Sequence, residues 1–130
     1  MSWVHETLTE FGMRIGLGSW SMGERGVAQL ELQAGGLLAV ELVRVREPEV
    51  LVYLGRPLGF DGPAVLRNAL ARAHYSAASV MPVQVSVRGE GPDALLLVLV
   101  RIPEAEFTID TLARTVEYLG RWSDGARNGH

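Results

Sequence analysis

The chain opens with apolar residues at helical spacing. Val4, Leu8, Phe11 and Ile15 follow one another at intervals of four, three and four residues, which places them on one face of a helix. Ser2 stands where an N-cap is expected. The pattern therefore predicts a first helix that buries this face, followed by a glycine-rich connection over residues 17–26.

From Val27 the apolar period changes from that of a helix to two, which is the period of a half-buried strand. Short turns then separate three such segments, so we expect an antiparallel meander of three strands. These strands cover residues 27–33, 37–43 and 50–54. The alternating apolar positions on one face of the first two are Ala28, Leu30, Leu32, Leu38, Val40 and Leu42.

A second helix is predicted after the meander. Asp61 is its expected cap, and Pro63 lies in the first turn, where a missing amide hydrogen costs nothing. One face of this helix is expected to hold Leu66, Leu70, Ala73 and Ala77. A strand over residues 82–88 follows, in which Val83, Val85 and Val87 alternate with polar residues. The glycine-containing loop at residues 89–93 then predicts a hairpin into the last strand.

The last predicted strand, residues 94–102, is apolar on both faces, and only Arg101 interrupts it. Successive side chains of a strand point to opposite faces, so both faces of this strand need a cover. The cover is the chain's own helices, an identical subunit or a bound partner. Three helices do not easily cover both faces of a five-stranded sheet. We therefore expect the first and last helices on one face, another protein on the other, and Arg101 at the solvent-facing end.

The final helix has the clearest stripe, and Thr108 or Asp110 can cap it. Its apolar positions are Ile109, Leu112, Val116, Leu119 and Trp122. The predicted fold is α+β, in the order helix, three-strand antiparallel meander, helix, two-strand hairpin, helix. We expect a single domain over residues 1–122 and a flexible tail over residues 123–130.

Composition narrows the class of protein. A chain of 130 residues without cysteine forms one domain and has no disulfide, thiol nucleophile or cysteine-based zinc site. Its net charge of −3 gives no reason to expect nucleic acid as a partner. No apolar run reaches the roughly 20 residues of a membrane span, and the N-terminus does not look like a signal peptide. We therefore expect a cytoplasmic protein that binds no membrane.

Candidate chemistry is sparse, and the sequence predicts no enzyme, no metal site and no cofactor. His5, His74 and His130 do not lie near one another along the chain, and no serine has the nucleophile-elbow pattern. Glu104 and Glu106 could bind a divalent ion, but charge at a helix N-terminus is the simpler interpretation. The alternative of a small ligand-binding domain using His74 and an arginine remains open. A binding site built on arginines would need several close together, and the nearest approach to such a cluster in the sequence is Arg44 with Arg46.

Together the residues and the order of elements resemble the class I chaperones of bacterial type III secretion, nearly end to end. The features that carry this resemblance are the amphipathic first helix running into Phe11-Gly12 and Gly16-Leu17, the meander segment Leu38-Ala39-Val40-Glu41-Leu42, and the closing helix with Leu112, Val116, Leu119 and Trp122. The opening Met1-Ser2-Trp3-Val4 looks like that of SycN-type members. The milder acidity and the glycine-rich residues 17–26 depart from the family pattern.

The resemblance implies a non-enzymatic dimer that binds an extended N-terminal segment of a secreted protein, its client. For SycN-type members the client is a YopN-like gatekeeper and the dimer mate is a second, YscB-like chaperone; otherwise the mate is a second copy. The family's dimer interface draws on the central helix and the following strand. Carried over to this sequence, the dimer interface would comprise Leu66, Leu70, Ala73, His74, Val83, Val85 and Val87.

The residues alone agree that this chain needs another chain, because it has surplus apolar strand surface and no catalytic cluster. An extended client can be held by strand addition and side-chain pockets. Trp3 and Trp20 lie at edges where large apolar groups favour protein contacts. The client-binding residues expected here are Trp3, Leu30, Leu32, Leu38, Val40 and Leu42. A dimeric interaction or scaffold domain without an extended client remains the alternative.

Overall fold

The computed structural model describes residues 3–16, 20–23, 26–32, 35–44, 47–59, 61–76 and 82–128. Ser2, Arg46, Ala77 and His130, to which the sequence analysis assigns roles, lie outside these residues. The elements are α1 (Trp3–Arg14), β1 (Val27–Glu31), β2 (Leu37–Val43), β3 (Glu49–Pro57), α2 (Gly62–Ser76), β4 (Gln84–Arg88), β5 (Leu95–Pro103) and α3 (Ile109–Asn128). Short 3-10 turns, η2 (Gly91–Asp93) and η3 (Glu104–Glu106), flank β5.

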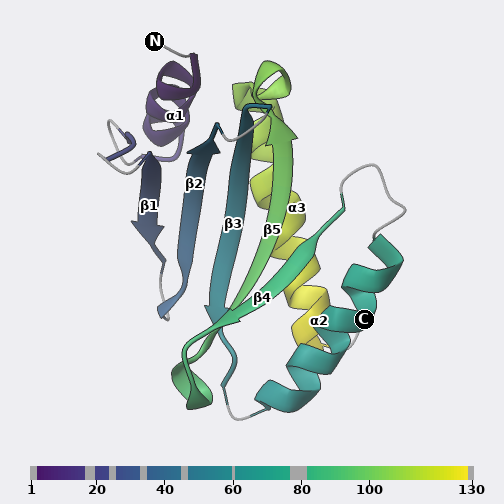
Figure 1. Cartoon of the computed structure of the whole chain (residues 1–130). Coiled ribbons are helices and arrows are strands. Elements are labelled where there is room, and N and C mark those ends of the chain that lie inside the picture. Colours follow the sequence, from purple (N-terminus) through teal and green to yellow (C-terminus); the bar gives the residue numbers. More distant parts are fainter. Residues whose placement is uncertain are drawn as a thin grey trace.

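The five strands form one antiparallel sheet in the order β1-β2-β3-β5-β4 (Figure 1). This confirms the predicted meander and hairpin, and hence the α+β fold. The hairpin joins the meander through β5, whose Val100 lies opposite Val52 of β3. The strand that is apolar on both faces therefore lies between two other strands, and β1 and β4 form the edges.

One face of the sheet is covered by the helices. Figure 1 shows α3 running behind β3 and β5, and α3 also packs against α1 and α2. Register places alternate residues of neighbouring strands on this face, and most of them are fully buried. The buried members are Ala28, Leu38, Val40, Val50, Val52, Leu54, Leu96, Val98, Val100 and Ile102. The core thus lies between this face and the helices.

Thr108 immediately precedes the helix α3, and its hydroxyl oxygen accepts a hydrogen bond of 3.1 Å from the backbone N–H of Thr111. Thr108 rather than Asp110 is therefore the cap. The expected flexible tail does not begin at residue 123, because α3 continues to Asn128 and both Ser123 and Ala126 are buried. The ordered domain therefore extends beyond the predicted boundary at residue 122.

Around α1 the structure confirms three predicted core residues and corrects two positions. Val4, Leu8 and Phe11 are buried, but the helix ends at Arg14, so Ile15 is exposed beyond it. Trp20 is buried instead of exposed. Its ring lies 6.1 Å from that of Phe11, and its Nε1 donates a 3.1 Å hydrogen bond to the carbonyl of Gln29.

The helix α2 turns a different face inward from the one predicted. Val65 and Ala69 are buried, whereas Leu70 is 53% exposed. The helix α2 packs against α3 and β4, and this packing, which the sequence pattern does not show, decides which of its faces is buried. Here the guanidinium of Arg72 lies 5.3 Å from the ring centre of Trp122, a cation–π distance.

Gly36 provides a test of the close packing between β2 and β3. A Cβ atom at this position would lie 2.8 Å from the carbonyl oxygen of Gly55, a backbone atom that cannot move aside. We expect Gly36→Ala to lower the free energy of unfolding by about 1–3 kcal/mol. The matched change Gly120→Ala meets no atom within 4 Å and should raise it by about 0.5–1 kcal/mol, because alanine is the better helix former. Urea unfolding of both variants measures the two changes in the free energy of unfolding. Changes of the same sign and size would contradict the prediction.

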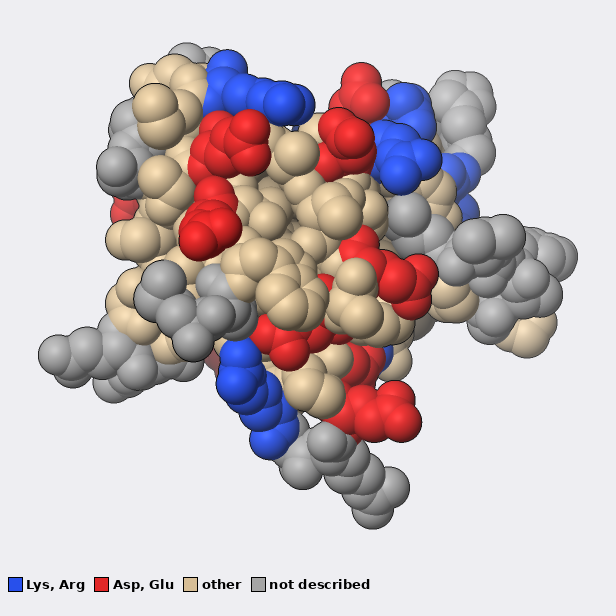
Figure 2. Space-filling view, turned by 90° about the horizontal axis from the view of Figure 1, so that it is seen from above, with Lys and Arg blue, Asp and Glu red and all other residues tan. Residues whose placement is uncertain are grey.

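The described charged side chains at one end of the molecule show no strong segregation by sign. At the end of the molecule seen in Figure 2, acidic and basic side chains of the described residues are interspersed, without one continuous basic patch. None of the described helices is long and apolar enough to cross a membrane. What the structure leaves available is the second face of the sheet.

Candidate functional site

The second face of the sheet carries apolar side chains, and no described helix packs on it. We call it the open face. It points toward the viewer in Figure 1, opposite to α3. Its large apolar side chains come from β2, β3 and β5; the leucines are partly buried and Tyr53 is buried. They form the open-face cluster, which consists of Leu37, Leu51, Tyr53, Leu95, Leu97 and Leu99.

Gly55 determines the shape of one end of this cluster. A Cβ atom there would lie 2.7 Å from Cδ2 of Leu97 and 3.3 Å from Cγ of Leu37. The missing side chain therefore lets these two leucines close over the β3 backbone. As a result the cluster is continuous from β2 to β5.

Beside the cluster the open face is hollowed. The hollow has a volume of about 400 Å³, which is enough for one or two large side chains but is open to solvent. Leu51, Tyr53, Leu97 and Leu99 supply its apolar lining. The polar residues around them are Glu41, Gln84, Ser86, Arg88 and Arg101. An apolar floor with polar groups at its border is typical of a site for a protein segment.

Three polar groups meet at one side of the hollow. The hydroxyl of Tyr53 hydrogen-bonds with both Glu41 and Arg88, donating to the carboxylate and accepting from the guanidinium. Burial raises the pKa of Tyr53 above its ordinary value, and the charge of Glu41 raises it further, while Arg88 opposes both. Tyr53 is therefore a neutral hydrogen-bonding group at physiological pH.

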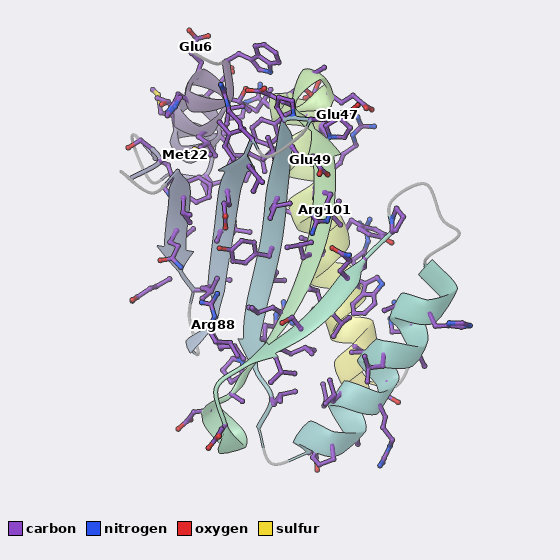
Figure 3. All side chains as sticks on the ribbon, in the orientation of Figure 1. Glu6, Met22, Glu47, Glu49, Arg88 and Arg101 are labelled. Carbon is purple, nitrogen blue, oxygen red and sulfur yellow. The ribbon has the colours of Figure 1, made fainter. Side chains whose placement is uncertain are left out.

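Arg101 lies on the other side of the hollow. Its Nε donates a 2.9 Å hydrogen bond to Gln84, and its guanidinium lies 3.8 Å from a carboxylate oxygen of Glu49. Both members of that ion pair are substantially exposed, so the pair is weak. Figure 3 shows Arg88 and Arg101 toward opposite ends of the open face. Arg101 is thus a solvent-facing residue of β5, as its place in the sequence indicates.

The predicted client-binding residues do not form one surface in this structure. Val40 is 0% exposed and Leu38 is buried with it, both under the helices. Leu30, Leu32 and Leu42 pack partly buried against the same core. Trp3 alone is well exposed, at 48%, while its Nε1 donates a 3.1 Å hydrogen bond to the carbonyl of Phe107.

For Leu38 and Val40 the assignment needs a correction: as the chain is folded, they offer a client no surface. The sequence analysis did not single out the open-face cluster, because the residues that it chose from β2 lie on the strand face that packs under the helices. The signal that could have found it was the apolar second face of residues 94–102, which supplies Leu95, Leu97 and Leu99.

The predicted dimer residues lie on α2, on β4 and, for Val83, immediately before β4. The helix α2 and the strand β4 pack against each other. Leu70, His74 and Val87 are exposed. Leu66, Ala73 and Val85 are half-buried, and Val83 belongs to the core. The structure thus brings these residues to one side of the molecule, and their role in a dimer stays a prediction.

The edge strand β1 is not fully available for strand addition. Along the outer edge of β1, the carbonyl of Val27 accepts a 3.0 Å hydrogen bond from the N–H of Gly23, and the carbonyl of Gln29 accepts one from Trp20. The segment at residues 20–23 therefore occupies part of this edge. An added strand would have to displace it or pair beyond it.

Candidate chemistry of other kinds finds no support in the described residues. No three His, Asp or Glu side chains among them are grouped as metal ligands. Glu104, considered for a divalent ion, instead pairs with Arg44 at 3.0 Å.

No protein-family model matches the chain. A search of curated proteins gives no match either.

Solved structures, in contrast, share the fold over almost the whole chain. A chain in the crystal structure of the ExsC–ExsE complex is 21% identical, with a TM-score of 0.75, and the match covers 98% of this chain and 96% of that one. A chain in the HopA1–SchA chaperone–effector complex is 17% identical, with a TM-score of 0.72 and coverage of 97% and 94%. The structure of the Yersinia pestis type III secretion chaperone SycH with a fragment of YscM2 matches at 15% identity, with a TM-score of 0.64 and coverage of 94% and 98%. The chain therefore shares the fold of these three solved chains.

Proposed function

We propose that this protein is a class I chaperone of type III secretion, which binds an extended N-terminal segment of a secreted client and keeps it competent for secretion. The observation that carries the proposal is the apolar open face, left uncovered in a fold that matches chains of chaperone–effector complexes. The proposed role needs no catalytic group and places the protein in the cytoplasm, where such clients are held before export.

The energetics favour a long client segment. Burying one leucine-sized side chain contributes about 1.5–3 kcal/mol, whereas ordering each residue of a disordered segment costs about 1–2 kcal/mol of backbone entropy. Because these terms nearly cancel, the open-face cluster alone would bind weakly. A client that also pairs with an edge strand, or reaches the exposed Trp3, gains the additional contacts.

We further propose that the protein acts as a dimer through α2 and β4. Leu70 and Val87 are large exposed apolar residues on these elements, which also carry the half-buried Leu66, Ala73 and Val85. A stable interface needs about 800 Å² per partner, an area that one helix and one strand can supply. The mate is a second copy or a YscB-like chaperone. A YopN-like gatekeeper is the client that the SycN-type resemblance favours.

Co-expression tests the chaperone proposal. The full chain is produced with the N-terminal region of each secreted protein encoded nearby, including any gatekeeper, and the complexes are purified by an affinity tag on the client. We expect one client to become soluble only with this protein and to be protected from protease along a continuous segment. As a control, the C-terminal region of the same client should not co-purify. Failure of every secreted protein to bind would overturn the proposal.

The same purified samples and the protease assay distinguish a chaperone from a scaffold domain. A dimer that forms without client, and that never protects a client segment from protease, would favour the scaffold alternative. A dimer that gains a protease-resistant client segment supports the chaperone.

A further inference from the structure

We propose that the hollow on the open face selects client segments in which apolar residues are flanked by carboxylates, with Arg88 and Arg101 as the groups that recognise these carboxylates. The inference rests on the proposed function and specifies the chemistry of its client. It concerns charges that are particular to this chain, at defined positions on β4 and β5.

The two arginines border one apolar floor from opposite ends. Arg88 pairs in register with Leu95, at the start of β5, and Arg101 lies six residues further along that strand. At about 3.3 Å per residue these positions are roughly 20 Å apart along β5, and Leu97 and Leu99 lie between them. A segment whose apolar side chains contact Leu97 and Leu99 therefore passes one arginine at each end.

Charge around the hollow favours an acidic segment. Two guanidinium groups and one carboxylate, that of Glu41, line it. Arg101 has only an exposed and long ion pair with Glu49, and a guanidinium has five N–H donors, so donors remain for a client carboxylate. Arg88 and Glu41 both interact with the Tyr53 hydroxyl, so Glu41 offsets part of the charge of Arg88 and leaves the hollow with one guanidinium in excess over its lining carboxylate. A basic segment would instead meet both arginines as like charges.

The hollow also has a feature that opposes acidic clients. Glu41 is the one carboxylate in the lining, and it lies on the Tyr53 and Arg88 side. Its removal should therefore strengthen binding of an acidic segment, whereas removal of an arginine should weaken it. These opposite signs distinguish recognition by charge from general damage to the surface.

Two synthetic peptides of equal length test the inference without knowledge of the natural client. They share the same leucines and differ only in the flanking residues, which are glutamate in one and lysine in the other. Fluorescence anisotropy with the full chain should show that the glutamate peptide binds roughly tenfold more tightly, as two surface ion pairs predict. High salt should reduce this preference.

Variants assign the preference to the arginines. The double change Arg88→Gln with Arg101→Gln should abolish it, while Glu41→Gln should increase it a few-fold. Arg114→Gln, an exposed arginine on α3, is the matched control and should leave it unchanged. Equal binding of the two peptides to the wild-type protein, no binding of either, or a preference that survives in the double variant would overturn the inference. Failure of the proposed function is recognised separately, because it appears as the absence of any secreted client in co-expression.

Discussion

An aspartate at Val98 is expected to unfold this protein, whereas an aspartate at the adjacent Leu99 is expected to leave it folded. The two residues are neighbours on β5, but Val98 is 1% exposed in the core and Leu99 belongs to the open-face cluster. An unpaired buried carboxylate costs several kcal/mol, which is a large part of the about 5–15 kcal/mol that stabilises a domain. Leu99→Asp loses part of one leucine's burial, about 1–2 kcal/mol.

Circular dichroism and urea unfolding measure whether each variant is folded, and co-purification measures whether it still binds a client. Val98→Asp should show no cooperative transition. Leu99→Asp should show one, yet fail to retain a client that the wild-type protein binds. Leu99→Met is the control for size and should retain both properties. If Leu99→Asp were as unfolded as Val98→Asp, the open face would have to be a second core in solution.

The second large effect is expected at Leu70, where Leu70→Asp should convert a dimer into a folded monomer. Leu70 lies on the outer side of α2 and is 53% exposed, so aspartate costs the monomer little beyond its lower helix propensity, about 0.5 kcal/mol. In the proposed interface the same carboxylate would be buried without a partner. A cost of about 3–5 kcal/mol corresponds to a dissociation constant raised by roughly two to four orders of magnitude.

Light scattering coupled to size exclusion, at several protein concentrations, measures the change in mass. Met13→Asp places the same charge on another exposed apolar residue, on α1, and should leave the dimer intact. Val87→Asp, on β4, should act like Leu70→Asp because both residues belong to the proposed interface. A wild-type monomer, or a dimer that tolerates both changes, would contradict the α2 and β4 interface.

Much of the fold could be predicted from periodicity. The change from helical spacing to alternation at Val27 separates α1 from the meander, and the stripe from Leu112 to Trp122 identifies α3. These signals are local, because each depends on one element having a buried and an exposed side. Ends of elements were predicted less well. The end of α3 is the clearest case: Ser123 and Ala126 continue the helical spacing from Leu119 and are buried, but their small and polar side chains give no apolar signal in the sequence.

The candidate site was predicted in kind but not in position. Leucines on both faces of residues 94–102 indicated that another protein chain should bind the sheet. Choosing Leu38 and Val40 as client contacts was a choice between two apolar faces of β2, because Leu37 and Ala39 lie on the other. Both sets of residues satisfy the same strand pattern, so local sequence could not distinguish core from surface.

By itself the sequence determined the order of elements, the absence of a cysteine chemistry and the surplus of apolar strand surface, because these depend on composition and on spacing between near neighbours. Only the tertiary structure decided which surface is surplus. Packing of α3 against β3 and β5 buries the face of Val98 and leaves the face of Leu99 open. Sheet order then brings Arg88, Arg101 and Glu41 around one hollow from three strands. These are contacts between residues far apart in the chain, which no local pattern specifies.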